Sequence, residues 1–287
     1  EPEILTRLFR QEKHAPDSIT MPPDRTVLSG GRHLRHELKY IINEGTYQYL
    51  RSRLLPLMSP DGHGRDGGYR VTSLYFDDVY NSGYWQKLNG AEVRRKFRIR
   101  AYDLDPSFVS LESKHKDISY VSKLSRKLTD EQYRALLLGD CSFMAEQDGE
   151  EDVFGEFYRT DRTLKLRPRI IVDYQREALV YPFGHVRITF DRKLSACFNT
   201  LDMFAPEAQY TRIYDKEIIL EVKFDNYIPD GIQAAMSECA HAAGIKIHNL
   251  YRQNAGGKIL WLTSSSRADP SSLTRSQSLA EAQISQM

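Results

Sequence analysis

Charged and apolar residues alternate with a period of two along five segments of the chain. In the first of these segments, Arg35, Glu37 and Lys39 take one parity and Leu38 and Tyr40 take the other. The five segments are 35–42, 94–102, 109–116, 186–191 and 217–224. Because successive side chains of a strand point to opposite faces, each segment is predicted to be a strand with one charged face and one apolar face.

Apolar spacing of three and four residues predicts three helices. They cover residues 46–56, 129–139 and 230–244, and the second opens with the pattern of a capping box. Two further segments, 71–78 and 168–177, are rich in β-branched and aromatic residues and predict additional strands. The pattern as a whole predicts an α+β fold dominated by strands.

The alternating segments and the helices fall between residues 33 and 263, which we interpret as one domain. Residues 1–32 and 264–287 lack sustained periodicity and are expected to be a flexible N-terminal tail and a disordered polar tail. We find no apolar run of membrane-spanning length and no apolar stretch of the signal-peptide type. We therefore expect a cytoplasmic protein, for which association with a membrane through a partner stays open.

The charged faces have an unusual composition. One such face is typical of a solvated antiparallel sheet. The five together consist largely of Arg, Lys and Glu, with few of the small polar residues that a solvent face normally mixes in, and this favours a ligand. If the strands close into a barrel with the charged faces inward, the like charges that line the lumen repel each other unless an anion binds there. Inorganic phosphate chains meet that requirement.

The charge count locates the positive charge. The whole chain is nearly neutral, with 40 Lys and Arg against 39 Asp and Glu, but residues 94–127 contain ten Lys and Arg against four acids. Arg binds phosphate oxygens in a bidentate manner and Lys acts as a point charge, so this mixture suits several phosphoryl groups in a row. A groove for nucleic acid is a weaker interpretation, because glutamates interrupt the basic faces.

Three glutamates lie two residues before a lysine on these faces: Glu37, Glu112 and Glu221. Mg²⁺ is commonly held by one or two carboxylates together with substrate phosphates, so these residues are candidate metal ligands. The alternative is that they form ion pairs with the neighbouring lysines.

An ordered set of motifs resembles the VTC domain, the polyphosphate polymerase branch of the triphosphate tunnel metalloenzymes. The motifs are RHELKY (35–40), SLYFDD (73–78), KLNG (87–90), RRKFRIRAY (94–102), SLESKHK (110–116), VSKLSRK (121–127), VDYQREAL (172–179), VRITFDRKL (186–194) and LEVKF (220–224). The resemblance covers about residues 33–260.

The resemblance implies a closed antiparallel β-barrel of about eight strands, with helices packed outside, that forms a tunnel for a triphosphate and uses Mn²⁺ or Mg²⁺. It implies these catalytic phosphate ligands: Lys39, Arg98, Arg100, Lys114, Arg176 and Arg187. It implies Glu221 as the metal ligand, and the charged faces add Glu112 and Glu37 as further candidates. Further substrate-binding residues would be Tyr174, Lys223, Lys123, Arg126 and, from the charged faces, Arg35 and Lys96.

The resemblance also implies an activity, the transfer of the γ-phosphoryl group of ATP to a growing polyphosphate chain with release of ADP. Hydrolase relatives carry Glu-x-Glu-x-Lys on the first strand, and Arg35 replaces the first glutamate here, which favours transfer. The family's Ser-Lys-Tyr near the C-terminal end corresponds to His248-Asn249-Leu250, without the lysine. Two alternatives therefore stay open: an inorganic or nucleotide triphosphatase, and a non-catalytic polyphosphate-binding module. The expected partners are ATP and polyphosphate, with no nucleic acid and with a membrane-protein partner left open.

Overall fold

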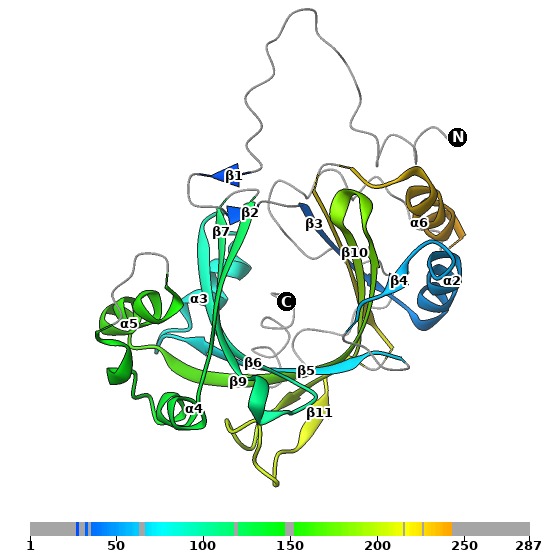
Figure 1. Cartoon of the computed structure of the whole chain (residues 1–287). Helices are drawn as coiled ribbons and strands as arrows, with labels where there is room; N and C mark the ends of the chain where they lie inside the picture. The colour runs from blue at the N-terminus through cyan, green and yellow to red at the C-terminus, as the bar shows by residue number, and fades with distance from the viewer. Residues whose placement is uncertain are drawn as a thin grey trace, which may run out of the picture. The chain divides into compact units, whose positions relative to one another are not determined.

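The computed structural model describes residues 27–28, 32–33, 36–62, 67–117, 120–146, 152–214, 216–225 and 227–242 (Figure 1). The longer strands are β3 (His36–Ile42), β5 (Tyr69–Asp77), β6 (Arg94–Tyr102), β7 (Ser110–Asp117), β8 (Tyr120–Lys127), β9 (Arg167–Tyr181), β10 (Val186–Cys197) and β12 (Ile218–Phe224). The short strands are β1 (Val27–Leu28), β2 (Arg32–His33), β4 (Ser59–Pro60) and β11 (Tyr210–Arg212). The helices are α2 (Glu44–Leu54), α3 (Ser82–Leu88), α4 (Asp130–Leu137), α5 (Val153–Leu164) and α6 (Asp230–Ala242), with 3₁₀ turns η1 (Pro106–Phe108), η2 (Ser142–Met144) and η3 (Phe183–His185).

The main sheet has the strand order β3-β12-β10-β9-β5-β6-β7-β8, with β4 paired to β9 and β11 paired to β10. The pairs β3–β12, β9–β5, β5–β6, β6–β7 and β7–β8 are antiparallel. All five segments with alternating parity are strands, as predicted: β3, β6, β7, β12 and the first half of β10. The α+β class is therefore confirmed.

The predicted closure of the barrel is wrong. The strand order is a path of eight strands whose ends are β3 and β8, and within the described residues no pairing joins these two ends. The sheet is open. Alternating parity fixes which face each side chain occupies, but it carries no information on whether the first and last strands of a sheet pair with each other.

The chain divides into two compact units. Unit 1 comprises Glu1–Gly64, Glu177–Phe190 and Lys216–Ser264. Unit 2 comprises Arg65–Arg176, Asp191–Asp215 and Ser265–Met287. Of the expected N-terminal tail, β1 pairs with β2 in a two-stranded sheet, and its other residues and the expected C-terminal tail lie outside the described part of the chain.

The core of unit 1 lies between the apolar face of its strands and the helices α2 and α6, which lie side by side in Figure 1. Leu50 and Leu54 of α2 and Ile232 of α6 are buried there against Phe190 and Val222. Helix α2 begins after Asn43, whose side chain accepts a hydrogen bond from the backbone of Thr46 at 2.8 Å. Burial of this apolar face orients the charged residues of the same strands to the other side of the sheet.

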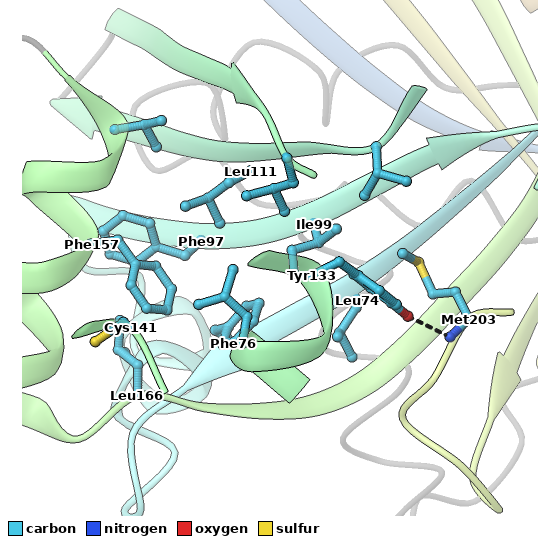
Figure 2. Close-up of a cluster of buried hydrophobic side chains, with 14 of the residues drawn as sticks. Leu74, Phe76, Phe97, Ile99, Leu111, Tyr133, Cys141, Phe157, Leu166 and Met203 are labelled. Atoms are coloured by element: carbon cyan, nitrogen blue, oxygen red, sulfur yellow. Dashed lines mark hydrogen bonds between the residues drawn. The ribbon is translucent and has the colours of Figure 1, made fainter. Parts of the chain in front are cut away.

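The core of unit 2 is built in the same way from β5, β6, β7, α4 and α5. Figure 2 shows Phe157 of α5 beside Phe76 and Phe97, with ring centroids 5.2 and 5.1 Å apart. It also shows the backbone N–H of Met203 donating to the hydroxyl of Tyr133 on α4, at 2.9 Å. Aromatic packing of this kind fixes α5 against one face of β6 and leaves the other face to the charged residues.

The three predicted helices are confirmed, and in the part of the chain that the structure describes two more, α3 and α5, were not predicted. The capping box that opens α4 is present, with reciprocal hydrogen bonds between Thr129 and Gln132. Helix α5 was overlooked although Val153, Phe154 and Phe157 are apolar at helical spacing and are all buried. No helix among the described residues is long and apolar enough to cross a membrane.

Candidate functional site

The charged face of unit 2 is formed by every second residue of β6, β7 and β8. The register of the three strands places these residues on one face: Arg94, Lys96, Arg98, Arg100, Glu112, Lys114, Lys116, Lys123 and Lys127. These are eight cations and one carboxylate on adjacent strands. We call this set the basic face of unit 2.

Three lysines form one row across the basic face. Lys96 on β6 is directly opposite Lys114 on β7, and Lys114 is directly opposite Lys123 on β8. The ammonium of Lys96 lies 5.0 Å from the centre of the Tyr75 ring, which supports it by a cation–π contact. Like charges in directly opposite positions destabilise a sheet, so this row is suited to an anion that neutralises it.

Glu112 is directly opposite Arg98 and is surrounded by cations of the basic face. Its Oε2 accepts from Arg98 Nε at 2.8 Å, and its Oε1 accepts from Lys123 Nζ at 2.6 Å. Although burial alone would raise the pKa of Glu112, Arg98, Arg100 and Lys123 outweigh it and hold the pKa well below its ordinary value. In return, Glu112 raises the pKa of Arg98 above its ordinary value against the opposing effect of burial. Glu112 therefore holds the cations in place.

Arg100 is two residues after Arg98 on β6, and its guanidinium contacts two tyrosines. Its Nη1 donates to the hydroxyl of Tyr102 at 3.4 Å and its Nη2 to the hydroxyl of Tyr174 at 3.5 Å. Burial raises the pKa of Tyr174 to about 12, so this hydroxyl keeps its proton at neutral pH. A tyrosine hydroxyl can therefore donate to a phosphate oxygen beside Arg100.

Arg176 of unit 2 is held in a buried, bidentate ion pair. Its Nε and Nη2 donate to the two carboxylate oxygens of Asp191 at 2.6 and 2.7 Å, and its guanidinium lies 5.1 Å from the centre of the Tyr174 ring. The side chains of Arg176 and Asp191 are 8% and 2% exposed. The pair fixes the guanidinium beside Tyr174.

In unit 1, four charged residues form a square on the paired strands β3 and β12. Lys39 is directly opposite Glu221, and Glu37 is directly opposite Lys223. Lys39 Nζ lies 2.9 Å from Glu221 and 3.1 Å from Glu37, and Lys223 Nζ lies 2.9 Å from Glu221. Glu221 and Glu37 raise the pKa of Lys39 above its ordinary value, although burial acts against this. We call these residues the charged square.

The charged square fits a divalent metal ion of the kind that completes its coordination with substrate oxygens. Glu37 and Glu221 both reach the position of Lys39 Nζ, so two carboxylates from different strands converge on one point. The described residues contain no group of three or more His, Cys, Asp and Glu side chains that could hold a metal. Two carboxylates are enough for Mg²⁺ when waters and phosphates supply the remaining oxygens. Glu112 is the single carboxylate among the described residues of the basic face, with no second one converging on it, and we leave it out of the metal site.

Arg187 of unit 1 also forms an ion pair. Its Nη2 donates to Asp61 Oδ2 at 2.6 Å, and the backbone N–H of Asp61 donates to the carbonyl of Ala178. The segment around Asp61 is thereby attached to β9 and β10 within unit 1. Asp61 and Asp191 were not among the predicted site residues. Asp61 belongs to none of the motifs, and Asp191, although it lies in VRITFDRKL (186–194), meets Arg176 only because β9 and β10 are neighbours in the sheet.

Among the described residues, Arg126 joins neither the basic face nor the charged square. Arg126 is on the opposite face of β8 from Lys123, where it pairs with Asp152 at 2.8 Å and lies 4.3 Å from the centre of the Phe154 ring. Arg126 is three residues after Lys123 in the sequence, and an odd spacing along a strand places two side chains on opposite faces. Arg35 lies outside the described residues.

Comparisons with known proteins identify one family. The model of the VTC domain matches residues 34–247 of this chain. No curated protein matches it.

Solved structures of similar fold are distant. A "putative adenylate cyclase" from Bacillus halodurans is 13% identical, with a TM-score of 0.44 over 77% of this chain and 99% of that chain. The PH1012 protein from Pyrococcus horikoshii is 10% identical, with a TM-score of 0.36 over 74% and 91%. A chain of the Schizosaccharomyces pombe Mediator head module is 11% identical, with a TM-score of 0.37 over 76% and 94%. At these TM-scores the likenesses carry no argument about activity.

Proposed function

This chain belongs to the VTC domain family, and on that premise we propose that it is a metal-dependent polyphosphate polymerase. It transfers the γ-phosphoryl group of ATP to the end of an inorganic polyphosphate chain and releases ADP. The observation that supports this proposal best is the row of Lys96, Lys114 and Lys123, because three cations in adjacent cross-strand positions suit a bound anion of high charge.

The basic face of unit 2 supplies binding and charge neutralisation. The lysine row interacts with successive phosphoryl groups as a set of point charges. Arg98 and Arg100, oriented by Glu112 and by the tyrosines, donate to the phosphoryl oxygens on which negative charge increases during transfer. Phosphoryl transfer requires little covalent chemistry from the protein, so positioning and electrostatics are sufficient and no protein nucleophile is assigned.

The charged square of unit 1 supplies the metal ligands in this proposal. Glu221 and Glu37, whose carboxylates both reach Lys39, would hold Mn²⁺ or Mg²⁺. A divalent ion supplies neutralisation of phosphate charge and orientation of phosphoryl oxygens when it is bound. Lys39 and Lys223 remain beside the carboxylates as cations for phosphate oxygens.

The test is incubation of the purified chain with ATP and either Mn²⁺ or Mg²⁺, with products resolved by gel electrophoresis and ³¹P NMR. We expect polyphosphate chains and an amount of ADP that matches the phosphoryl groups transferred. Orthophosphate in place of polyphosphate would identify a triphosphatase. Tight binding of added polyphosphate without turnover would identify a binding module, and either result would overturn the polymerase proposal.

A further inference from the structure

A buried serine lies beside Arg100 on the basic face of unit 2. Ser73 on β5 is directly opposite Arg100 on β6, and directly opposite residues of an antiparallel pair share one face. On its other side, Ser73 is directly opposite Val172 of β9. Ser73 therefore lies between Val172 and Arg100 at one register position of the sheet.

Ser73 and Arg100 each have a polar atom that is not hydrogen-bonded within the part of the chain that the structure describes. These atoms are Ser73 Oγ and Arg100 Nε, and both are buried. Ser73 is 0% exposed and Arg100 is 7% exposed. The two groups come from adjacent strands at one register position, so two unsatisfied donors occur together rather than at unrelated places.

Such a pair is costly for a folded protein. A buried donor without a partner loses its hydrogen bonds to water and gains nothing in return, and native structures contain few of them. Alanine at position 73 would remove this cost. A serine that is retained at an energetic cost within a charged face is typical of a residue that serves a ligand.

The other contacts of Arg100 are weak. Its hydrogen bonds to the hydroxyls of Tyr102 and Tyr174 are 3.4 and 3.5 Å long, at the weak end for this type of bond. Its nearest carboxylate contact, Glu112, is 3.9 Å from Nη1. No strong partner therefore fixes the guanidinium, in contrast to Arg98 and Arg176, whose carboxylate partners lie within 2.8 Å.

We propose that Ser73 is a further substrate-binding residue, and that Ser73 Oγ and Arg100 Nε donate to the same phosphoryl oxygen of an inorganic phosphate chain. A phosphoryl oxygen has lone pairs for two donors, and one ionic and one neutral donor from adjacent strands then hold it. This inference rests on the proposed function only in taking a phosphate chain as the ligand; it does not depend on whether that chain is extended or hydrolysed.

The test compares Ser73→Ala with the matched variant Ser113→Ala in the full chain. Ser113 is also 0% exposed, but it is on the opposite face of β7 and is hydrogen-bonded to His115 at 3.0 Å. The probe is inorganic tripolyphosphate, with its Kd measured by calorimetry and the melting temperature of the ligand-free protein measured in parallel. Ser73→Cys, which keeps the shape and weakens the donor, controls for the small cavity.

We expect Ser73→Ala to weaken tripolyphosphate binding by roughly 10- to 100-fold, as for loss of a hydrogen bond to a charged group, while its melting temperature stays equal or rises. Ser73→Cys should also weaken binding. Ser113→Ala should instead leave the Kd unchanged and lower the melting temperature. A Ser73→Ala protein that melts earlier and binds like wild type would overturn the inference, because the hydroxyl would then be structural.

The same measurements separate this inference from the proposed function. If wild type binds tripolyphosphate, Ser73→Ala does not, and no polyphosphate is made from ATP, the inference stands and the polymerase proposal falls. If polyphosphate is made and Ser73→Ala binds normally, the inference falls alone. If wild type does not bind tripolyphosphate, both fall.

Discussion

Lys96 lies directly opposite Lys114 in the β6–β7 pair, so two like charges occupy one cross-strand position of the basic face. Other cations have an acid partner in the structure: Lys123, at the end of the same row, pairs with Glu112, and Arg176 pairs with Asp191. The expectation that a face of like charges repels itself without an anion therefore holds only for part of the molecule. Lys96 and Lys114 are the place where two like charges lie directly opposite each other, and it is where the first substitution is informative.

Lys114→Gln should weaken tripolyphosphate binding by tenfold or more and leave the melting temperature unchanged or slightly raised. Lys114 is the middle residue of the row, so its removal takes one cation from a phosphate and relieves two like-charge contacts, each worth roughly 0.2–1 kcal/mol. Calorimetry at two ionic strengths checks this, and the loss should be largest at low salt because screening is weakest there.

Arg98→Ala makes a poorer probe of the same site. Arg98 is ion-paired with Glu112, whose side chain is 3% exposed, and removal of one partner of a buried pair destabilises a protein by roughly 3–5 kcal/mol. A loss of activity in Arg98→Ala would therefore mix binding with folding. An unchanged Kd in Lys114→Gln, with an intact fold, would refute the role of the lysine row.

Lys123 and Arg126 offer a matched pair of substitutions on one strand. Lys123→Ala removes a cation from the basic face and should weaken tripolyphosphate binding by about tenfold, as for loss of a charged hydrogen bond. Arg126→Ala removes a contact with Phe154 and an exposed ion pair with Asp152, so it should lower stability by roughly 0.5–1 kcal/mol and leave Kd unchanged. The two readouts are Kd and the midpoint of urea unfolding. Weaker binding in Arg126→Ala would show that the two faces of β8 are not functionally distinct.

The contrast between these two residues shows what could be predicted from the sequence. Alternation of charged and apolar residues assigned the faces of β3, β6, β7 and β12 correctly, because burial of one face is a local property of each strand. The same rule applied to β8 places Arg126 on the opposite face from Lys123, since the two residues are separated by three positions.

The acids that hold the arginines could not be predicted. Asp61 and Arg187 are separated by 126 positions, and Asp191 pairs with an arginine of another strand. Such pairs depend on strand order and register, which no local pattern encodes. Closure of the sheet is a property of the same kind, and this is why the faces were predicted correctly while the closed barrel was not.

Stability should fall in acid through Glu112. Its pKa in the folded protein is below the ordinary value of 4.5, so the carboxylate contributes stability above about pH 4.5 that is lost as the pH falls below that value. Glu112→Gln should melt earlier than wild type at pH 7, because Arg98 and Lys123 lose their buried partner. Between pH 6 and pH 3.5 its melting temperature should decline less than that of wild type. Equal declines in scanning calorimetry would show that Glu112 does not carry the proposed charge.

Metal binding should depend on the two carboxylates that reach Lys39. Glu221→Gln removes the more buried of them, at 3% exposure against 12% for Glu37, and should reduce Mn²⁺ affinity tenfold or more. Glu37→Gln should have a smaller effect in the same direction. Titration of the ligand-free protein followed by electron paramagnetic resonance measures the affinity without reference to activity, and removal of the metal by EDTA should stop turnover in the ATP assay.

Glu177 provides the matched control for this metal site. It is a buried glutamate of unit 1 that accepts from Tyr47 at 2.6 Å and Arg51 at 2.8 Å, on the side of β9 that faces α2. Glu177→Gln should therefore lower the melting temperature as Glu221→Gln does, because both leave a cation without its carboxylate, but it should leave Mn²⁺ affinity unchanged. Equal Mn²⁺ affinities in all three variants and wild type would mean that Glu221 and Glu37 serve only to hold Lys39 and Lys223, and the metal ion would then have to bind elsewhere in the chain.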